Sequence, residues 1–451
     1  MLRAFTQIRR DPLNFLRGCA ERYGDVVEFP IPGRQVFFAN HPDAVQQILQ
    51  SEHRTHDRAT VQYRTLSLVT GNGLLTSDGE LWRRQRRLMQ PAFHREVLSN
   101  FVGHIDIAVD RLLASWSRQA DGDVVDVDDA MMRTALEVVG RSLFSHDLSG
   151  EARELVDAVL KALDVVVARA RSPLAAPLGW PTPGNMALKR SLRTLDRTVE
   201  VMVEARRQAQ RRGGGPEVPD LLGMLLASEG FDDRQLRDEI VTLIVAGHET
   251  VASALTWTWH LLGQNPDALA KLHAEVDDVL GGARPTFEDL PRLTYTRQVI
   301  DESLRLYPPA WVVSRRATAD GDILGTPVPA GSYTFISPYV LHRTAAYWPD
   351  PDRFDPDRFD PDRSDPDRSD PDRLVPERKA ESSRFAYVPF GAGPNLCIGR
   401  DLAVMESVML VASVASKWSL EPLVGREVRV DPLVTIRPHG GLPMALKRRS
   451  G

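Results

Sequence analysis

The chain has 451 residues, of which 42% are apolar and 26% are charged, and its formal net charge is -5. This ordinary composition excludes a disordered or fibrous protein, and the acidic balance argues against a general nucleic-acid-binding function. Two cysteines are too few for a disulfide framework and fit a reducing compartment. No run approaches 18 apolar residues and the first ten residues lack the apolar core of a signal peptide, so we expect a cytoplasmic protein without a transmembrane span.

Hydrophobic periodicity predicts a short strand-rich start followed by mostly helical sequence. From about residue 80 to 270, apolar residues recur at spacings of three and four, which is typical of helices. Pro308-Pro309 ends the last long helix of this region, and strands and turns are expected beyond it. The expected elements are strands at 26–29 and 35–39, helices at 41–49, 233–263 and 295–307, and a final helix after residue 399.

Three segments interrupt this pattern. Residues 172–184 hold four prolines, and residues 211–216 read Arg-Arg-Gly-Gly-Gly-Pro. Each is either a simple surface loop or a gate over a substrate site. Residues 350–374 form five tandem pentads that begin Asp-Pro-Asp-Arg, and because proline and alternating charge cannot build a core, we expect an exposed loop expansion there.

The surroundings of Cys397 are the first feature that indicates chemistry. Glycines precede it at 391 and 393, and Gly399 follows it. Glycine lets the backbone approach a flat ligand, and the helix expected after the cysteine directs its positive end at the sulfur. Both features favour a thiolate, which is an iron ligand, although a buried cysteine is often only a small apolar side chain.

Two helical clusters carry acids. Glu302 and Arg305 share a face at i and i+3, either as a functional pair or as an ordinary surface ion pair. Ala246-Gly247-His248-Glu249-Thr250 places an acid and a hydroxyl in an otherwise apolar helix, where the two small residues would leave room for a ligand. His248-Glu249 is not a zinc-protease motif, because Ala252 stands where the second histidine is needed.

A basic helix is expected around residue 84. Trp82 and Arg86 share one face at i and i+4, whereas Arg83, Arg84 and Arg87 lie mostly on other faces. The first face suits a buried anion while the other arginines stay in solvent. The alternative is a basic helix that is solvated on all sides.

In their order and spacing, these clusters resemble the motifs of the cytochromes P-450. That family has a Trp-x-x-x-Arg helix, an acid–alcohol pair on a long central helix, a Glu-x-x-Arg helix, an arginine in a Pro-Glu-Arg-Phe-like segment and a Phe-x-x-Gly-x-Arg-x-Cys-x-Gly haem loop. The matching residues here are Trp82 and Arg86, Glu249 and Thr250, Glu302 and Arg305, Arg358, and Phe390, Gly393, Cys397 and Gly399. The resemblance covers essentially the whole chain and implies the cytochrome P-450 fold, mainly α with small β-sheets, as a single catalytic domain over residues 1–451.

The resemblance implies a haem b cofactor with Cys397 as the iron ligand. Asn395 departs from the family, which usually has Arg or His two residues before the cysteine, so the contact with a haem propionate is weaker there or supplied elsewhere. Arg316 is a less favoured alternative to Arg315 for that contact. The implied haem-binding residues are Trp82, Arg86, Ala246, Gly247, Arg315, Phe390, Gly391, Asn395, Cys397 and Gly399.

The resemblance also assigns structural and catalytic roles. Glu302, Arg305 and Arg358 would lock the haem loop without taking part in catalysis, with Arg353 of the first pentad as a rival to Arg358. Glu249 and Thr250 would deliver protons to dioxygen bound against the small residues of the same helix, Thr250 by hydrogen bonding and Glu249 as part of a relay.

Electrons would come from a separate protein, because the chain has no flavin or iron–sulfur segment. The resemblance implies a ferredoxin with its ferredoxin reductase, and Arg83, Arg84 and Arg87 are candidate contacts for such an acidic partner. The acid–alcohol pair favours a reductase-dependent monooxygenase over a peroxide-driven enzyme.

The segments that line the substrate pocket in this family are apolar here. The implied lining residues are Gln62, Tyr63, Leu66, Leu74, Leu243, Trp311, Val312 and Ile436. The strings at 62–64, 73–76, 171–174, 245–257 and 306–311 are especially similar to β-carotene hydroxylases of this family from thermophilic bacteria.

The inferred reaction is therefore hydroxylation of a β-ionone ring at C3 or C2, with room for a transient membrane contact that collects a lipid-like substrate. The alternatives are a fatty-acid or terpenoid hydroxylase and, from another class, a haem-thiolate binding or sensor protein without turnover.

Overall fold

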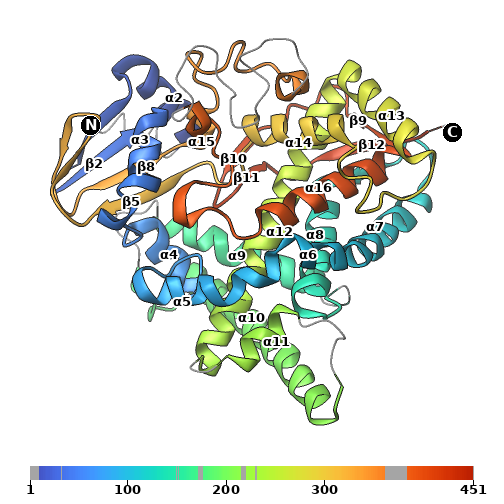
Figure 1. Ribbon diagram of the computed structural model, residues 1–451, viewed down its shortest axis with the longest axis horizontal. Helices are drawn as coiled ribbons and strands as arrows, with labels where there is room; N and C mark the ends of the chain where they lie inside the picture. The colour runs from blue at the N-terminus through green and yellow to red at the C-terminus, as the bar shows by residue number, and fades with distance from the viewer. Residues whose placement is uncertain are drawn as a thin grey trace.

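The computed structural model describes residues 10–31, 33–148, 150, 152–170, 176–214, 220–228, 231–360 and 383–449. Helices occupy the centre and one side of the molecule, and the largest sheet lies at the other side (Figure 1). The longer helices are α2 (Pro12–Tyr23), α4 (Val61–Thr70), α5 (Gly79–Met89), α7 (Val102–Ser117), α8 (Val127–Phe144), α9 (Ala152–Ala170), α10 (Pro183–Arg211), α11 (Leu221–Ala227), α12 (Asp233–Gln264), α13 (Pro266–Leu280), α14 (Thr294–Leu306) and α16 (Arg400–Ala415). The short helical segments are α3 (Pro42–Gln46), η1 (Gln47–Ser51), η2 (His53–Thr55), η3 (Gln90–Phe93), α6 (Arg95–Leu98), η4 (Ser99–Phe101), α15 (Pro338–Leu341), η5 (Pro356–Phe359), η6 (Ser383–Ala386) and η7 (Gly393–Asn395).

The largest sheet has five strands in the order β1-β2-β8-β5-β3. These strands are β1 (Val26–Ile31), β2 (Arg34–Ala39), β8 (Tyr333–Ile336), β5 (Val313–Ala317) and β3 (His56–Asp57). β2 and β8 pair in parallel, and the other neighbours are antiparallel. The small sheets are β4 (Val124–Asp126) with β12 (Pro443–Arg448) and β9 (Trp418–Pro422), β6 (Gly321–Ile323) with β7 (Thr326–Val328), and β10 (Val430–Pro432) with β11 (Ile436–Pro438). The predicted class, mainly α with small sheets, is confirmed.

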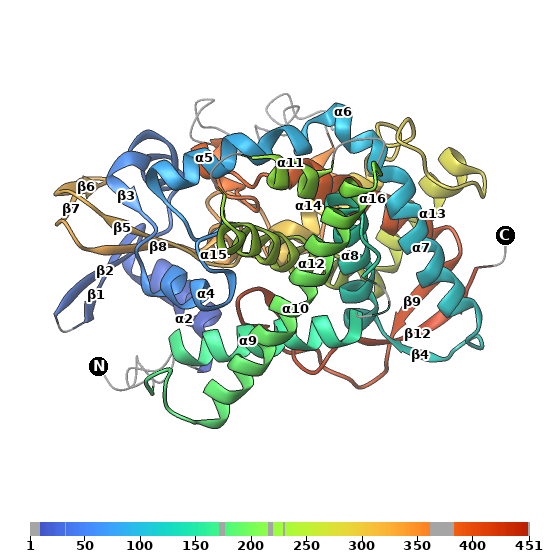
Figure 2. The same cartoon turned by 90° about the horizontal axis from the view of Figure 1, so that it is seen from below.

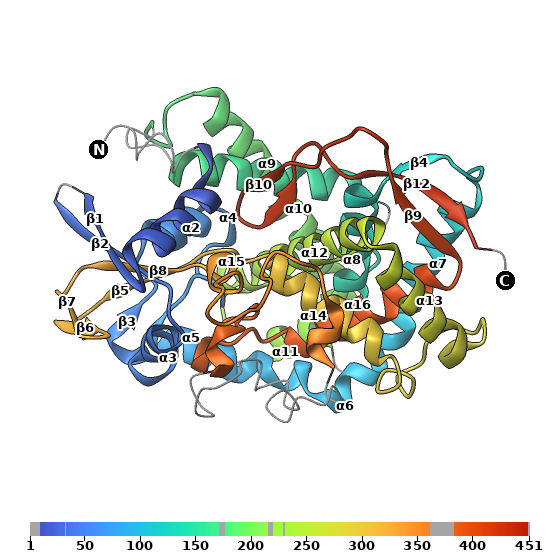
Figure 3. The ribbon, with the colours of Figure 1, turned by 90° about the horizontal axis from the view of Figure 1, so that it is seen from above.

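Helix α12 is the central element of the core. Asp232 caps its start by accepting a hydrogen bond from the Gln235 N–H at 2.7 Å, and Pro266 begins α13 after it ends. Figures 2 and 3 show α12 between α5 on one side and α9 on the other. Among the described helices it is the one long and apolar enough to cross a membrane, yet 83% of its apolar window is buried, as in a core helix.

The close packing of α12 on α8 depends on Gly247. A Cβ atom at this position would lie 2.7 Å from Cγ2 of Val139 on α8, which is far inside van der Waals contact. The side chain that Gly247 lacks would therefore point at α8, a packing role that the sequence analysis did not foresee. The missing side chain leaves room for α8, although the Gly247 backbone itself remains partly exposed.

Several element boundaries differ from the sequence prediction. The helix expected at 41–49 is α3 followed without a break by the π-helical segment η1. Pro183 belongs to α10 and not to the preceding loop, because Thr182 caps the helix by accepting from the Asn185 N–H at 3.2 Å. Residues 171–175, 215–219 and 361–382 lie outside the described residues, and with them part of both candidate gates and most of the pentad loop.

Candidate active site

One face of α12 is open within an otherwise buried helix. From Asp238 to Leu262 every side chain is buried except Ala246, Gly247 and Thr250, which are half-buried. Positions i, i+1 and i+4 share one side of a helix. The hydroxyl of Thr250 donates to the Ala246 carbonyl at 2.6 Å, so it lies along this open face.

The loop of residues 390–399 is likewise open. Phe390, Gly391, Asn395 and Gly399 are half-buried, and Cys397 is exposed. The Cys397 N–H donates to the Phe390 carbonyl at 3.0 Å and closes the loop. Helix α16 starts directly after it and lies beside α12, so the loop and the open face of α12 belong to neighbouring elements (Figure 1).

The two glycines before Cys397 have different tasks. Gly391 has a φ of 74° and open space where a Cβ would be, as expected where a flat ligand approaches the backbone. Gly393 has a φ of 65°, and a Cβ there would lie 2.0 Å from the carbonyl oxygen of Leu49. This second glycine therefore serves the packing of the loop on η1.

The Cys397 thiol borders open space, yet the protein around that space shields it from bulk water. Burial raises the pKa of Cys397, and this outweighs the Gly399 N–H and the guanidinium of Arg86, which both lower it. The loop and the start of the helix favour the thiolate as expected, and burial of the sulfur is a separate effect that opposes them. A metal cation bound to the sulfur would supply the remaining stabilisation.

Helix α5 divides its basic residues as the spacing predicts. Trp82 and Arg86 are half-buried, whereas Arg83, Arg84 and Arg87 are exposed. The Nη1 of Arg86 donates to the Leu396 carbonyl at 2.8 Å, which brings this guanidinium to the cysteine loop. The exposed group is a basic surface, within which Arg84 stacks on the ring of Phe231 at 5.2 Å.

Arg58, between β3 and α4, is a site residue that the sequence analysis missed. It is only 8% exposed, and its Nη2 donates to Oδ1 of Asn395 at 2.7 Å. Its Nη1 donates to the carbonyls of Leu74 and Ser77 at 3.0 and 3.1 Å. Its partner Asn395 is 337 residues away in the sequence, so no local signal in the sequence marks Arg58.

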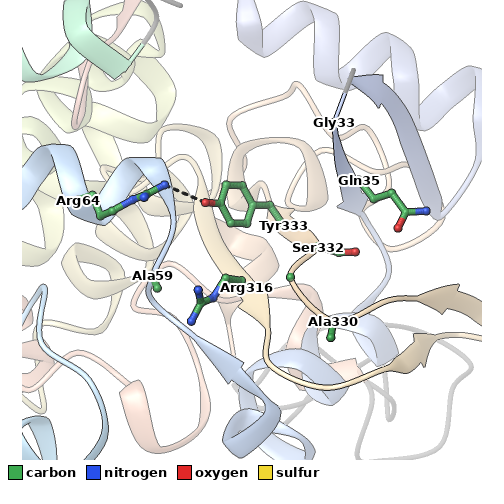
Figure 4. Close-up of a pocket in the computed structure, with 9 residues that line it drawn as sticks. Gly33, Gln35, Ala59, Arg64, Arg316, Ala330, Ser332 and Tyr333 are labelled. Atoms are coloured by element: carbon green, nitrogen blue, oxygen red, sulfur yellow. Dashed lines mark hydrogen bonds between the residues drawn. The ribbon is translucent and has the colours of Figure 1, made fainter.

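The structure separates Arg315 from Arg316, because neighbouring residues of a strand face opposite sides. Arg315 is buried and its Nη1 donates to the Tyr63 hydroxyl at 3.0 Å, on the side of Arg58. Arg316 pairs with Asp57 and lines a surface hollow of about 610 Å³. In Figure 4, it lies there near Arg64 and Tyr333, whose side chains are joined by a hydrogen bond of 2.9 Å.

Glu302, Arg305 and Arg358 meet in the protein interior. Glu302 and Arg305 are both fully buried and share two hydrogen bonds of 2.6 and 2.8 Å. The Nε of Arg358 donates to Glu302 at 3.1 Å and its Nη1 to the Pro349 carbonyl at 3.0 Å. Arg353, the rival position, is exposed and contributes its backbone carbonyl as an acceptor.

His342 links this ion cluster to the cysteine loop, and it was also missed. Arg305 donates to the His342 carbonyl at 2.7 Å, and the Val388 N–H donates to Nε2 of the ring at 2.9 Å. Burial lowers the pKa of His342 to about 3, so the ring is neutral and able to accept this bond. Val388 lies two residues before Phe390.

Glu249 points away from the open face of α12. Its Oε1 accepts from the Thr435 hydroxyl at 2.9 Å, and both side chains are buried. Burial raises the pKa of Glu249 to about 7, although Arg437 and Thr435 lower it. Glu249 and Thr250, which the sequence analysis treated as one pair, therefore lie on different faces of α12.

The predicted pocket-lining residues differ in how far their side chains are exposed. Gln62, Tyr63 and Val312 are half-buried, while Leu66, Leu74, Leu243 and Trp311 each keep 5–9% exposure. Ile436 is fully buried, and its carbonyl accepts from Ser253 and from the Trp257 indole. The assignment of Ile436 to the pocket is therefore wrong, because the residue is part of the core beneath it.

Together these residues form a site for a particular kind of ligand. A cysteine sulfur is a soft metal ligand, an open glycine admits a flat group, and guanidinium groups bind carboxylates. Arg58, Arg86 and Arg315 hydrogen-bond to neutral acceptors, and no carboxylate of the described residues forms an ion pair with them. A flat, metal-containing ligand with carboxylate groups fits this arrangement.

Comparisons with known proteins find relatives that match almost the full chain. The family model for Cytochrome P450 matches residues 2–441. Cyclooctat-9-en-7-ol 5-monooxygenase of Streptomyces melanosporofaciens is 38% identical over 98% of this chain and 92% of that protein. Pentalenene oxygenase of Streptomyces avermitilis is 34% identical over 98% of this chain and 94% of that protein.

A solved structure is similar over the same length. The crystal structure of CYP175A1 from Thermus thermophilus has a TM-score of 0.76 and 30% sequence identity. The match covers 98% of this chain and 96% of that chain. The similarity therefore includes every element that contributes to the site, and the predicted fold is confirmed.

Arg358 and Arg353 make a matched pair for testing the ion cluster. Arg358→Met should lower the free energy of unfolding by about 3 kcal/mol, because it removes charge-assisted hydrogen bonds inside the protein. Arg353→Met removes an exposed side chain and should stay within about 0.5 kcal/mol of the wild type. Urea unfolding followed by circular dichroism measures the free energy of unfolding of both variants. An equal decrease in the two variants would contradict the assignment of Arg358 to the ion cluster.

Glu249→Gln should change how stability depends on pH. The folded-state pKa of about 7 lies above the ordinary value of 4.5, so the folded protein retains a proton that the unfolded chain releases between these pH values. Wild-type stability therefore falls as pH rises through this window, and the loss is complete above pH 7. The variant lacks this loss, so its stability relative to wild type should rise by on the order of 3 kcal/mol from pH 4.5 to 7.5.

Urea unfolding at a series of pH values measures this difference. Glu421→Gln, which alters an exposed carboxyl of β9, is the control and should leave the profile unchanged. Parallel profiles for Glu249→Gln and the wild type would contradict the assigned burial effect.

Proposed function

The chain belongs to the cytochrome P450 family, and on this basis we propose that it hydroxylates an isoprenoid substrate. Family membership itself makes the protein a cytochrome P450 monooxygenase with haem b as cofactor. Enzymes of this family take electrons from a redox partner and bind hydrophobic substrates. The open face of α12, where Ala246, Gly247 and Thr250 are half-buried in a buried helix, supports a site for oxygenation, and two relatives named for terpenoids carry the choice of substrate.

The residues present fit haem b. We propose that Cys397 binds the iron, that Gly391 gives the porphyrin room, and that Arg86 and Arg315 face its carboxylates. Trp82, half-buried on the same face of α5 as Arg86, would pack beside it. When bound, the haem supplies the oxidation, and the protein supplies placement and protons.

We propose that protons reach the site from two sides of α12. Thr250 holds a hydroxyl proton on the open face, where it donates to the Ala246 carbonyl at rest. Glu249 holds a proton on Oε1 or Oε2 near neutral pH, on the side of Thr435. Asp164 on α9 is exposed and acts electrostatically on Glu249, and we propose that it passes protons from water toward this buried carboxyl. A side-chain rotation of Glu249 would connect the two sides.

We place a cyclic terpenoid first among substrates. The relatives that are 38% and 34% identical are named for cyclooctat-9-en-7-ol and pentalenene, which are terpenoids, and they match almost the full chain. The mostly apolar lining supports such a substrate: Leu66, Leu74, Leu243 and Trp311 contribute apolar surface. The half-buried amide of Gln62 donates to the Val312 carbonyl at 3.2 Å and leaves little unpaired polarity in this wall.

β-Carotene is the second candidate, with attack at C3 or C2 of its ring. The strings at 62–64 and 306–311, in which we see a resemblance to β-carotene hydroxylases, support it, and they lie in described segments near the half-buried Tyr63 and Val312. A fatty acid would use the same apolar wall but has no relative among those compared above.

We further propose a ferredoxin as the electron donor in the cytoplasm. The exposed Arg83, Arg84 and Arg87 lie on α5, and their neighbour Arg86 contacts the cysteine loop at Leu396. An acidic ferredoxin bound there would stand close to the iron ligand. A sensor without turnover would need neither the Thr250 hydroxyl nor this basic surface.

The first experiment is a binding and turnover assay with the purified holoenzyme. A cyclic terpene alcohol, β-carotene and a long-chain fatty acid are each titrated while the haem absorbance is followed. Each is then supplied with oxygen, ferredoxin, its reductase and NADPH, and the products are identified by mass spectrometry. We expect addition of one oxygen atom to the terpenoid. Turnover of the fatty acid alone would overturn the isoprenoid proposal, and neither electron uptake nor product with any of the three compounds would favour a sensor.

Thr250→Ala should uncouple electron use from hydroxylation. Loss of the hydroxyl on the open face removes a proton donor, so product formed per NADPH should fall several-fold while hydrogen peroxide rises. Thr258→Ala is the matched control, because that hydroxyl makes the same bond to the carbonyl four residues earlier but is buried away from the open face. An unchanged product yield in Thr250→Ala would contradict the assignment.

A further inference from the structure

A group of three arginines lies at the edge of the site without a balancing anion. Arg86 and Arg315 both act electrostatically on Arg58, and the hydrogen bonds of the three go to carbonyls, a tyrosine hydroxyl and an amide. Burial lowers the pKa of Arg58 to about 10, and the other two arginines add to this, so Arg58 stays charged at neutral pH at an energetic cost. Asp78 offsets part of that cost, and its carboxylate accepts from the backbone N–H of Arg58 at 2.6 Å.

Arg58 is the most constrained member of this group. Its Nη1 and Nη2 are held by Leu74, Ser77 and Asn395, and its guanidinium lies 5.8 Å from the ring centres of both Tyr63 and Trp82. Its Nε is buried and has no hydrogen-bond partner among the described residues. A buried donor without a partner is costly, so an acceptor is missing at this edge.

The partner of Arg58 explains the departure at position 395. An arginine or histidine two residues before the cysteine would bring its own charge, whereas Asn395 is neutral. The Asn395 amide oxygen instead accepts from Arg58, which is 337 residues away in sequence. A cation at position 395 would lie at hydrogen-bond distance from Arg58 and would be repelled by it. Only one of the two positions is therefore expected to carry a positive charge.

We propose that Arg58 binds a carboxylate of the haem and supplies the positive charge that position 395 lacks, with Asn395 holding its guanidinium in place. Guanidinium groups bind carboxylates with paired, charge-assisted hydrogen bonds, and Nε is available for one of them. Arg86 and Arg315 complete a group of three cations around two carboxylates. The haem then supplies the anion that this cluster lacks.

The test is a charge exchange between positions 58 and 395 in the holoenzyme. Arg58→Met should speed haem transfer to apomyoglobin at least tenfold and lower the haem reduction potential, because loss of a nearby cation favours the ferric state. Arg58→Lys should stay near the wild type in potential. Asn395→Arg in the Arg58→Met background should recover both values, while the same change in the wild type should improve neither.

Arg316→Met is the control, because Arg316 is a neighbouring cation that pairs with Asp57 on the outer surface. It should leave haem transfer and potential unchanged. Wild-type values in Arg58→Met would overturn the proposal. Equal impairment of the Lys and Met variants, with no recovery by Asn395→Arg, would also overturn it, because Arg58 would then act through its shape alone.

A second measurement covers the case in which Arg58→Met does not fold. The haem propionate bending band in the resonance Raman spectrum reports on hydrogen bonds to the carboxylates. Arg58→Lys cannot form the paired contact, so this band should shift from its wild-type position. An unshifted band would contradict a direct contact between Arg58 and the haem.

Discussion

The fully buried ion pair of Glu302 and Arg305 is the interaction on which the site depends. Two charges without access to water hold together only if every remaining donor and acceptor is used. Arg305 therefore also binds the carbonyls of His342, Pro351 and Arg353. These contacts fix the irregular segment that follows α15, which has few regular backbone hydrogen bonds of its own.

From this pair a set of contacts reaches the loop that carries Cys397. The neutral ring of His342 accepts a hydrogen bond from the Val388 N–H. Two residues later, the Phe390 carbonyl accepts a hydrogen bond from the N–H of Cys397. The cysteine loop is thus positioned by charges that lie at the end of α14. Rigidity in a loop of glycines comes here from long-range polar contacts and not from local secondary structure.

Much of the fold could be predicted from periodicity and breakers. Asp233–Gln264, Thr294–Leu306 and the β1–β2 hairpin were expected to within one or two residues, because apolar spacing, prolines and the turn at Gly33 are local signals. The division of α5 between Trp82 and Arg86 and the exposed arginines also followed from helical spacing. The order of the five strands did not, since pairing is decided by chain segments hundreds of residues apart.

The residues of the site could be predicted where they belong to a contiguous motif. The prediction failed where the interacting residues are far apart in the sequence. Arg58 drew no attention in the sequence because its partner Asn395 is 337 residues away. Glu249 looked like a partner of Thr250, but its actual partner, Thr435, lies on the segment before β11. At Gly247 the sequence could not show that the missing Cβ would point at α8, because this depends on which helix packs next to it.

The contact of Gly247 with Val139 has a consequence for how this enzyme could diversify. It fixes the spacing of α8 and α12 at the level of the open face, deep in the core and independent of the segments that carry Tyr63 or Val312. Evolution can therefore exchange the outer walls of the pocket while the inner frame stays unaltered. Substitutions in the outer walls would then change which substrate binds, while the arrangement of α8 and α12 at the site of reaction stays the same.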